Sequence, residues 1–279
     1  MPFAAASVVL EAHWWALNSL PFAIWTVGLS VLLGLVAWYA GSATPMAAAA
    51  GAAITASLMF STAIVPYLPW RTALVPVLAL LALTSLATRM GRAHKERLGT
   101  AEKRRGRSAA QVAANLGVAA LVSNQVAQTF LTDANWLPQT LLTPMPLFAL
   151  GLAALAEAAA DTVSSEVGQV LGGRPRMIAT LRVADPGTDG AVSLAGTAAG
   201  VAAAAIVAVA GAWALGGGAA MMGVAWAGGV FGLFFDSVLG ATLERRGWIN
   251  NDMVNFLSTA SAAAFALGLM MVWPHGRIA

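Results

Sequence analysis

Four acidic side chains lie within or at the ends of stretches that are otherwise apolar enough for lipid: Glu157, Asp161, Glu166 and Asp236. A carboxylate inside a membrane helix is costly, and it persists mainly where it faces a bundle interior or a water-filled cavity. Only 10% of the residues are charged, so these four are the first candidates for chemistry. Carboxylate oxygens suit Mg²⁺, which proteins bind through one or two carboxylates together with substrate phosphates.

Glu157 and Asp161 are four residues apart in the segment EAAADTVSSEVGQ. In a helix this spacing places both carboxylates on one face, which Ser165 continues. Glu166 is five residues beyond Asp161 and therefore lies off that face. A metal–phosphate site explains this pattern, and so does a polar helix end that pairs with nearby arginines; the residues alone leave both interpretations open.

Asp236 shares a helical stripe with Gly232 and Gly240, because the three residues are spaced by four. Small residues let a second helix, or a ligand, approach closely. The stripe therefore favours a site at Asp236. The alternative is a carboxylate that pairs with Arg245 or Arg246 at the membrane edge.

Amide and acidic side chains at two further helix starts add to this set. Gln111 and Asn115 share a face at the depth of the carboxylates, directly after a basic loop. Asn251 and Asn255 share another face, and Asp252 lies beside them, either as the N-cap of the last helix or as part of a site.

Small and hydroxyl residues open the apolar segment that follows the Asp189-Gly190 turn, and they include Ser193, Gly196 and Thr197. Backbone N–H groups at such a helix start can hold phosphate. Close helix packing is the preferred interpretation of the small residues.

A basic segment, residues 89–107, holds eight of the fifteen Lys and Arg residues. The simpler interpretation is that these charges set the orientation in the membrane and contact anionic lipid. Its sharper interpretation is a phosphate clamp made by Arg104, Arg105 and Arg107, because guanidinium groups bind phosphate oxygens bidentately.

The elements that must position these residues are transmembrane helices. The chain is 59% hydrophobic with a mean hydropathy of +0.75, whereas soluble domains carry about a quarter charged residues. We therefore predict an all-α, polytopic bundle of about eight spans (range seven to nine) that forms one integral membrane domain over residues 1–279. The absence of cysteine excludes disulfides and thiolate metal sites.

The apolar segments give the predicted spans. Residues 191–235 are expected to form a helical hairpin broken at Gly216-Gly217-Gly218, since glycines are a poor helix interior. The other predicted spans are residues 20–40, 46–65, 71–88, 108–130, 138–169 and 253–273. The first eighteen residues suit an interfacial helix.

The basic loops predict the orientation. With eight spans, residues 89–107, 174–182 and 245–246 fall on one side and hold thirteen of the fifteen bases. That side is expected to be cytoplasmic, with both termini outside a bacterial inner membrane. Basic residues that flank spans also argue against nucleic acid as a partner.

Four motifs occur in order between about Arg89 and about Ala263: GTAEKRRGRSAAQVAAN, ADTVSSEVGQ, GTDGAVSLAGTAAG and FDSVLGATLERRGWINNDMVNFLS. Together they resemble the integral-membrane family that includes plastid phytyl-phosphate kinase, long catalogued as a domain of unknown function. That family is distantly similar to the CTP-dependent dolichol and phytol kinases. The resemblance makes residues 108–263 a motif-bearing catalytic core.

The resemblance implies phosphoryl transfer from a nucleoside triphosphate, with CTP expected, to phytyl or polyprenyl monophosphate, which gives the diphosphate. Mg²⁺ is the implied cofactor, although no soluble-kinase phosphate loop is present. Catalysis and metal binding are assigned to Asp161, Glu166 and Asp236. Substrate binding is assigned to Arg104, Arg105, Arg107, Gln111, Asn115, Ser165, Ser193, Thr197, Asp252 and Asn255.

Two other functions stay open. A cytidylyltransferase that forms a CDP-lipid would use similar carboxylates and Mg²⁺. A transporter or flippase of lipid phosphates would need a polar path through the whole membrane, but only Asn124, Gln125 and Gln128 are strongly polar toward the outer half, where helix–helix contacts explain them. The expected partners are an isoprenoid-phosphate lipid, a nucleoside triphosphate and membrane lipids; a homodimer is compatible with the sequence.

Overall fold

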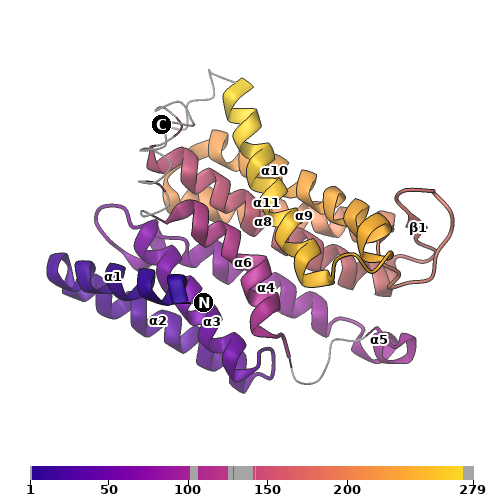
Figure 1. Cartoon of the computed structure of the whole chain (residues 1–279), viewed down its shortest axis with the longest axis horizontal. Helices are drawn as coiled ribbons and strands as arrows, with labels where there is room; N and C mark the ends of the chain where they lie inside the picture. Colours follow the sequence, from indigo (N-terminus) through magenta and orange to yellow (C-terminus); the bar gives the residue numbers. More distant parts are fainter. Residues whose placement is uncertain (1, 101–105, 125–127, 129–140, 142, 273–279) are drawn as a thin grey trace.

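The structure of the protein, a computed structural model, describes residues 2–100, 106–124, 128, 141 and 143–272. These residues are mostly helical, as predicted (Figure 1). The α-helices are α1 (Pro2–Asn18), α2 (Leu20–Tyr39), α3 (Pro45–Ser61), α4 (Leu74–Arg89), α5 (Arg92–Leu98), α6 (Ala109–Ser123), α8 (Pro144–Leu171), α9 (Leu194–Leu215), α10 (Gly218–Leu239) and α11 (Asn251–Val272). The shorter elements are η1 (Pro69–Arg71), the π-turn η3 (Gly240–Glu244), β1 (Arg176–Met177) and β2 (Ala191–Val192).

Helix α8 is the centre of the bundle. Every residue from Pro146 to Ala160 is buried, and α4, α6, α9, α10 and α11 pack around it. Small residues make this packing close: a Cβ added at Gly229 of α10 would come within 2.8 Å of Ala156. Helices associate in membranes through such small-residue contacts, and here they bring polar groups on three helices near one another.

The N-terminal helices form a layer on the opposite side of the bundle from α9–α11 (Figure 1). Helices α1, α2 and α3 contact one another, and α3 also packs on α6. Edge-to-face aromatic contacts join the layer, with Trp15 at 4.8 Å from Phe22 and 5.1 Å from Tyr67 between ring centroids. The layer therefore closes the α4–α6 side of the core.

Each predicted apolar segment contains a helix within its described residues, but fewer of these helices are long enough to cross a membrane. By length and composition, five described helices qualify, or six if the bent pair α4–α5 is one span. The expectation of about eight spans is therefore too high by this measure. Helices α3 and α6 fall short at 17 and 15 residues, because α6 ends at Ser123 rather than at residue 130.

The predicted hairpin is confirmed. Helix α9 ends at Leu215, Gly216 adopts a φ of +73°, and α10 begins at Gly218. A positive φ is the left-handed conformation that glycine adopts at no steric cost. The three glycines therefore reverse the chain between two spans.

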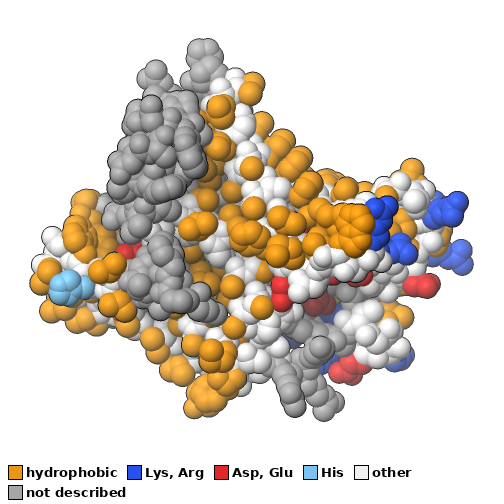
Figure 2. Space-filling model, viewed as in Figure 1, with side chains coloured by type: hydrophobic (Ala, Val, Ile, Leu, Met, Phe, Trp, Pro, Cys, Tyr) orange, Lys and Arg blue, Asp and Glu red, His pale blue; other side chains and the backbone are white. Residues whose placement is uncertain are grey.

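The three basic loops lie at one end of the bundle. Figure 2 shows basic side chains gathered at the end that carries β1. The loop after α8 folds into the β1–β2 hairpin, and Arg245 Nη1 donates to Met177 Sδ at 3.4 Å. Arg107 of the first basic loop and residues of the second line one cavity at this end, which agrees with the predicted placement of these loops on the same side.

Candidate functional site

A polar cavity of about 400 Å³ opens at the basic end of the bundle. It lies among α6, α8, α10, α11 and the loop between α8 and α9. The predicted residues that line it are Asp161, Glu166, Asp236, Arg107, Gln111, Asn115, Ser165, Ser193 and Asn255. Residues from five chain segments therefore meet in one place, with a volume within the range of small-molecule sites.

Two carboxyl groups lie against each other at the wall of this cavity. The carboxyl groups of Asp161 on α8 and Asp236 on α10 are in hydrogen-bonding contact. Glu157 lies one turn deeper on α8, is 1% exposed, and interacts with both. The Ser258 side chain of α11 lies close to Glu157 and Asp236, but its hydroxyl donates to the Asn255 carbonyl oxygen at 3.0 Å, so its single proton cannot serve both carboxyl groups.

The glycine stripe on α10 explains how the carboxylates come together. A Cβ added at Gly232 would come within 3.0 Å of the Ser258 carbonyl oxygen and would also overlap the Glu157 side chain. The helix therefore runs against α8 and α11 at this point. The glycine stripe predicted from the spacing of Gly232 and Asp236 therefore lets the neighbouring helices approach closely, as expected.

The π-turn η3 places one further carboxylate that the prediction missed. Glu244 lines the cavity and interacts with Asp161 and Asp189. A Cβ added at Gly240 would meet the Gly190 backbone N at 2.9 Å, so the turn is pressed against the predicted Asp189-Gly190 turn. Glu244 continues the spacing of four from Asp236, which is a signal that the sequence does contain. Single π-turns inside helices frequently occur at functional sites.

Among the residues that the structure describes, Arg107 is the basic residue that lines the cavity. It interacts electrostatically with Asp161. Its backbone N–H donates to the Ser42 carbonyl oxygen at 3.0 Å, and its own carbonyl oxygen accepts from the Thr44 N–H at 3.1 Å. Gly106 has a φ of +72° and leaves no room for a Cβ beside Ala43.

The remaining members of the proposed clamp, Arg104 and Arg105, lie outside the described residues. Gln111 and Asn115 follow on α6, and both line the cavity. Gln111 also has a structural role, because its Oε1 accepts from the Ser108 N–H at 2.7 Å and the Ser108 hydroxyl accepts from the Gln111 N–H in return. This capping box fixes the start of α6.

Glu166 lines the cavity but has a specific cationic partner. The buried Lys95 of α5 donates its ammonium to Glu166 Oε2 at 2.5 Å and to the carbonyl oxygens of Ala87 and Thr88 at 3.1 and 2.8 Å. The pair holds α5 against α8. Because the Glu166 carboxylate is already paired with Lys95, the argument for a metal site rests on Asp161 and Asp236.

Two predicted residues do not line the cavity. Thr197 lies one helical turn beyond Ser193, whose hydroxyl accepts from the Gly196 N–H at 3.1 Å. Asp252 lies beside the face of α11 that Asn251 and Asn255 present to the cavity. The substrate-binding assignments to these two residues therefore find no support in the geometry.

The N-cap prediction for Asp252 is wrong. The Asn250 side chain accepts from the Met253 N–H at 2.9 Å and so caps α11. The helix begins at Asn251, which places Asp252 inside the first turn. An acidic residue there still favours the helix through the macrodipole.

Several buried oxygens around the cavity have no hydrogen-bond partner among the described residues. They include Asp236 Oδ2, Glu157 Oε1, Thr100 Oγ1 and Gln169 Oε1. No set of three His, Cys, Asp or Glu side chains within the described ranges is arranged as a complete metal cage. Mg²⁺ does not need one, because it binds through one or two carboxylates plus phosphates, and the orphaned carboxylate oxygens fit that pattern.

A bundle of apolar helices with a polar cavity at one end defines a polytopic integral membrane protein. The chain belongs to the integral membrane protein family DUF92, whose model matches residues 28–263. The family resemblance drawn from the four motifs is therefore confirmed. No solved structure matches the chain.

Three relatives show how far the similarity extends. An uncharacterized membrane protein of Synechocystis is 36% identical over 203 residues, which cover 69% of this chain and 72% of the relative. An uncharacterized membrane protein of Methanocaldococcus jannaschii is 40% identical over 108 residues, 39% of this chain and 45% of the relative. The chloroplastic protein VTE6 of Arabidopsis thaliana is 27% identical over 195 residues, 68% of this chain and 56% of the relative.

Proposed function

We propose that the protein is a membrane-embedded kinase of isoprenoid monophosphates, with a nucleoside triphosphate, expected to be CTP, as donor and phytyl or polyprenyl monophosphate as acceptor. One observation carries the proposal: Asp161, Asp236 and Arg107, from three chain segments, meet in a polar cavity at the basic end of an apolar bundle. The similarity to the Arabidopsis chloroplastic protein VTE6 and the resemblance to a family that includes plastid phytyl-phosphate kinase support an isoprenoid substrate.

The side chains suit the charge that phosphoryl transfer must neutralise. Such transfer needs positioned phosphates and cationic groups, with little covalent work for the protein. Asp161 and Asp236 would hold Mg²⁺, which would supply positive charge to neutralise the donor phosphates. Arg107 would bind phosphate oxygens through its guanidinium fork, and Asn115 would add an amide donor.

Phosphoryl transfer to a lipid monophosphate needs no general base from the protein. An oxygen of the lipid monophosphate attacks the terminal phosphorus of the donor, and the bond from that phosphorus to the bridging oxygen breaks. The nucleoside diphosphate leaves and the lipid diphosphate forms. Since the attacking oxygen is already anionic, the protein has only to align the two phosphates and to exclude water.

One assay tests the proposal. Purified protein receives CTP or ATP, Mg²⁺ and phytyl or polyprenyl monophosphate, and the products are identified by mass spectrometry. Lipid diphosphate together with CDP or ADP is the expected result. Pyrophosphate with a CDP-lipid would instead identify a cytidylyltransferase, and the absence of any nucleotide-dependent product would overturn the enzymatic proposal.

We also propose that the basic end of the bundle faces the cytoplasm of a bacterial inner membrane, as basic loops usually do. The chain contains no cysteine, so single cysteines report orientation directly. A cysteine introduced at Arg174, which is exposed beside the cavity end, should react with an impermeant maleimide only in inverted vesicles. Reaction in right-side-out vesicles would reverse the orientation.

A further inference from the structure

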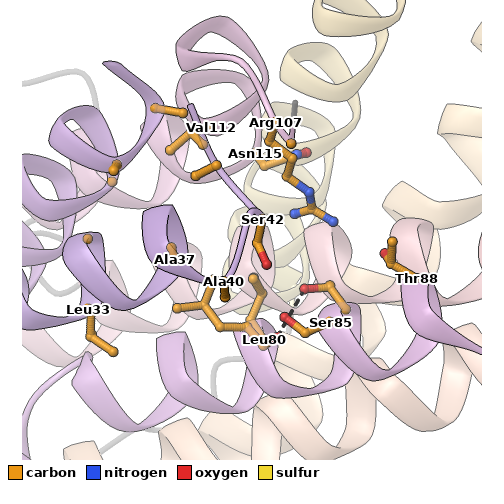
Figure 3. Close-up of a pocket in the computed structure, with 18 of the residues that line it drawn as sticks. Leu33, Ala37, Ala40, Ser42, Leu80, Ser85, Thr88, Arg107, Val112 and Asn115 are labelled. Atoms are coloured by element: carbon orange, nitrogen blue, oxygen red, sulfur yellow. Dashed lines mark hydrogen bonds between the residues drawn. The ribbon is translucent and has the colours of Figure 1, made fainter. Parts of the chain in front are cut away.

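A second cavity, of about 160 Å³, lies among α2, α3, α4 and α6, beside the polar site (Figure 3). Its walls are mainly apolar and include Leu33, Ala37, Leu80, Val112 and Leu116. A cavity of about this size accommodates a benzene-sized apolar group. One branched five-carbon unit of an isoprenoid chain therefore fits inside it.

The two cavities adjoin, because two residues line both of them. Arg107 and Asn115 line both of them, and Figure 3 shows the Arg107 side chain reaching over the second cavity, with Ser85 and Thr88 on the facing helix. The apolar space therefore begins where a phosphate bound by Arg107 would end. A lipid that carries a phosphate has the same order of parts: a charged head followed at once by an apolar chain.

This cavity lies beneath one helix whose outer face is exposed. It is bounded by α2, the most exposed of the five apolar helices that qualify as spans, with exposed Leu32, Leu35 and Val36 on its surface. An exposed apolar helix surface in a membrane protein faces hydrocarbon. A chain longer than the cavity can therefore continue along α2 into the bilayer.

We propose that this second cavity binds the head-proximal part of the isoprenoid chain of the acceptor, with the phosphate held at Arg107 between the two cavities. The proposal rests on the proposed kinase function and deepens it by naming where the lipid lies. It commits to the substrate chain as the occupant. It assigns a specificity role to α2, α3 and α4, which otherwise lie outside the polar site.

Gly51 of α3 offers a direct way to fill this space. A Cβ added there would meet only Val112 Cγ1, at 3.7 Å, which is ordinary van der Waals contact. A larger side chain at this position can therefore enter the cavity without displacing backbone. Gly34, by contrast, is pressed against α3, since its Cβ would lie 2.8 Å from the Ala48 carbonyl oxygen.

The first test labels the wild-type protein in membranes. A prenyl monophosphate with a diazirine on its first isoprene unit is photoactivated, and the labelled peptides are mapped by mass spectrometry. Labels on residues 33–51, 77–88 or 112–116 support the inference. Labels confined to other segments overturn it, as does a diazirine phospholipid that labels these residues to the same extent.

The second test uses Gly51→Leu with Gly28→Leu as its matched control, because Gly28 lies on α2 with no atom within 4 Å of an added Cβ. Gly51→Leu should raise the KM for the prenyl monophosphate about tenfold, which corresponds to about 1.4 kcal/mol, and should leave the KM for the nucleotide unchanged. Gly28→Leu should change neither KM. An unchanged lipid KM in Gly51→Leu overturns the inference.

Phosphoryl transfer is followed separately as release of CDP or ADP. Transfer without labels in the second cavity would overturn this inference and leave the proposed kinase function standing. Labels in the second cavity without phosphoryl transfer would overturn the proposed kinase function. They would then identify a lipid-phosphate site that serves a different reaction.

Discussion

Two regions of the bundle hold carboxylates among apolar helices, and their surroundings differ. At the end opposite the basic loops, Glu11 of α1 accepts hydrogen bonds from Ser57 Oγ at 3.0 Å, Ser61 Oγ at 2.7 Å and Asn124 Nδ2 at 3.2 Å. At the basic end, Asp161 and Asp236 face each other, and Asp236 Oδ2 has no partner among the described residues.

This difference separates a structural role from a functional one. A buried polar group without a partner costs about 1–3 kcal/mol, so it calls for an explanation, whereas the carboxylate of Glu11 already has one. The Glu11 cluster fastens α1 to α3 and to the end of α6. In the polar cavity some carboxylate oxygens are buried without a partner among the described residues, and a bound cation with phosphates would supply the missing partners.

The largest expected effect comes from the polar cavity. Asp161→Asn or Asp236→Asn should lower kcat for diphosphate formation on the order of a thousandfold, the scale seen when one preorganised electrostatic group is removed. The rate is measured in detergent or vesicles with saturating nucleotide. Glu11→Gln, the same type of change in the other cluster, should keep kcat within about twofold; a comparable loss there would remove the contrast between the two regions.

The Lys95–Glu166 pair tests whether a carboxylate at the cavity wall is structural. Glu166→Gln leaves a buried ammonium without its counter-ion, which typically costs about 3–5 kcal/mol, so thermal stability should fall. Lys95→Met combined with Glu166→Gln removes both charges and should recover much of the lost thermal stability.

Activity of that double variant decides the role of Glu166. Wild-type turnover, measured at equal amounts of folded protein, is expected if Glu166 only holds α5. A double variant that folds but is inactive would place Glu166 among the metal-binding or catalytic groups, as its position in the sequence first suggested.

Arg107→Lys should have a smaller effect on catalysis. Lysine keeps the charge but loses the bidentate fork, so kcat/KM for the lipid phosphate should fall about tenfold, or ~1.4 kcal/mol. Arg71→Lys, at the other end of the bundle where Arg71 Nη1 contacts the Trp213 carbonyl oxygen at 3.3 Å, serves as the control. Equal effects in both variants would argue against a phosphate at Arg107.

The smallest effect concerns the pH dependence of stability at Glu11. Burial raises the pKa of Glu11 above its usual 4.5, and the hydrogen bonds from Ser61 and Ser57 counter this only in part. The unfolded chain therefore loses this proton at a lower pH than the folded protein does. Between pH 4.5 and the raised pKa the free energy of unfolding falls as pH rises.

Glu11→Gln should remove that component of the pH dependence. The measurement is the difference between wild-type and variant melting temperatures across pH 4–8 in one detergent. A difference that does not vary with pH would mean that Glu11 has the same pKa in the folded and unfolded states.

Much of the fold could be predicted from the sequence, because apolar length and glycine breaks act locally. The hairpin at Gly216-Gly217-Gly218 is an example. The lengths of α3 and α6 could not be predicted in the same way. Both begin at side-chain caps, at Thr44 and at Ser108, and an apolar segment beyond a helix end has the same composition as one within it.

The site was predictable in part for a related reason. Helical spacing brought Asp161 and Asp236 forward, and a continuation of the same spacing would have led to Glu244, which the prediction missed. The Lys95–Glu166 pair joins residues 71 positions apart, and no local pattern records that choice of partner. Asn250 as the cap of α11 differed from the prediction by two residues, which lies within the usual uncertainty of helix boundaries.

The backbone of Arg107 is tied to the α2–α3 turn through Ser42 and Thr44, and Gly106 is wedged against Ala43. The guanidinium group thus depends for its position on a layer that otherwise contributes nothing to the polar cavity. The rate of the proposed phosphoryl transfer should therefore depend on how firmly the N-terminal helices are packed. In a detergent that loosens the packing of α1–α3 while α8–α11 remain packed, the protein should lose activity. On heating in such a detergent, activity should be lost at a lower temperature than helicity.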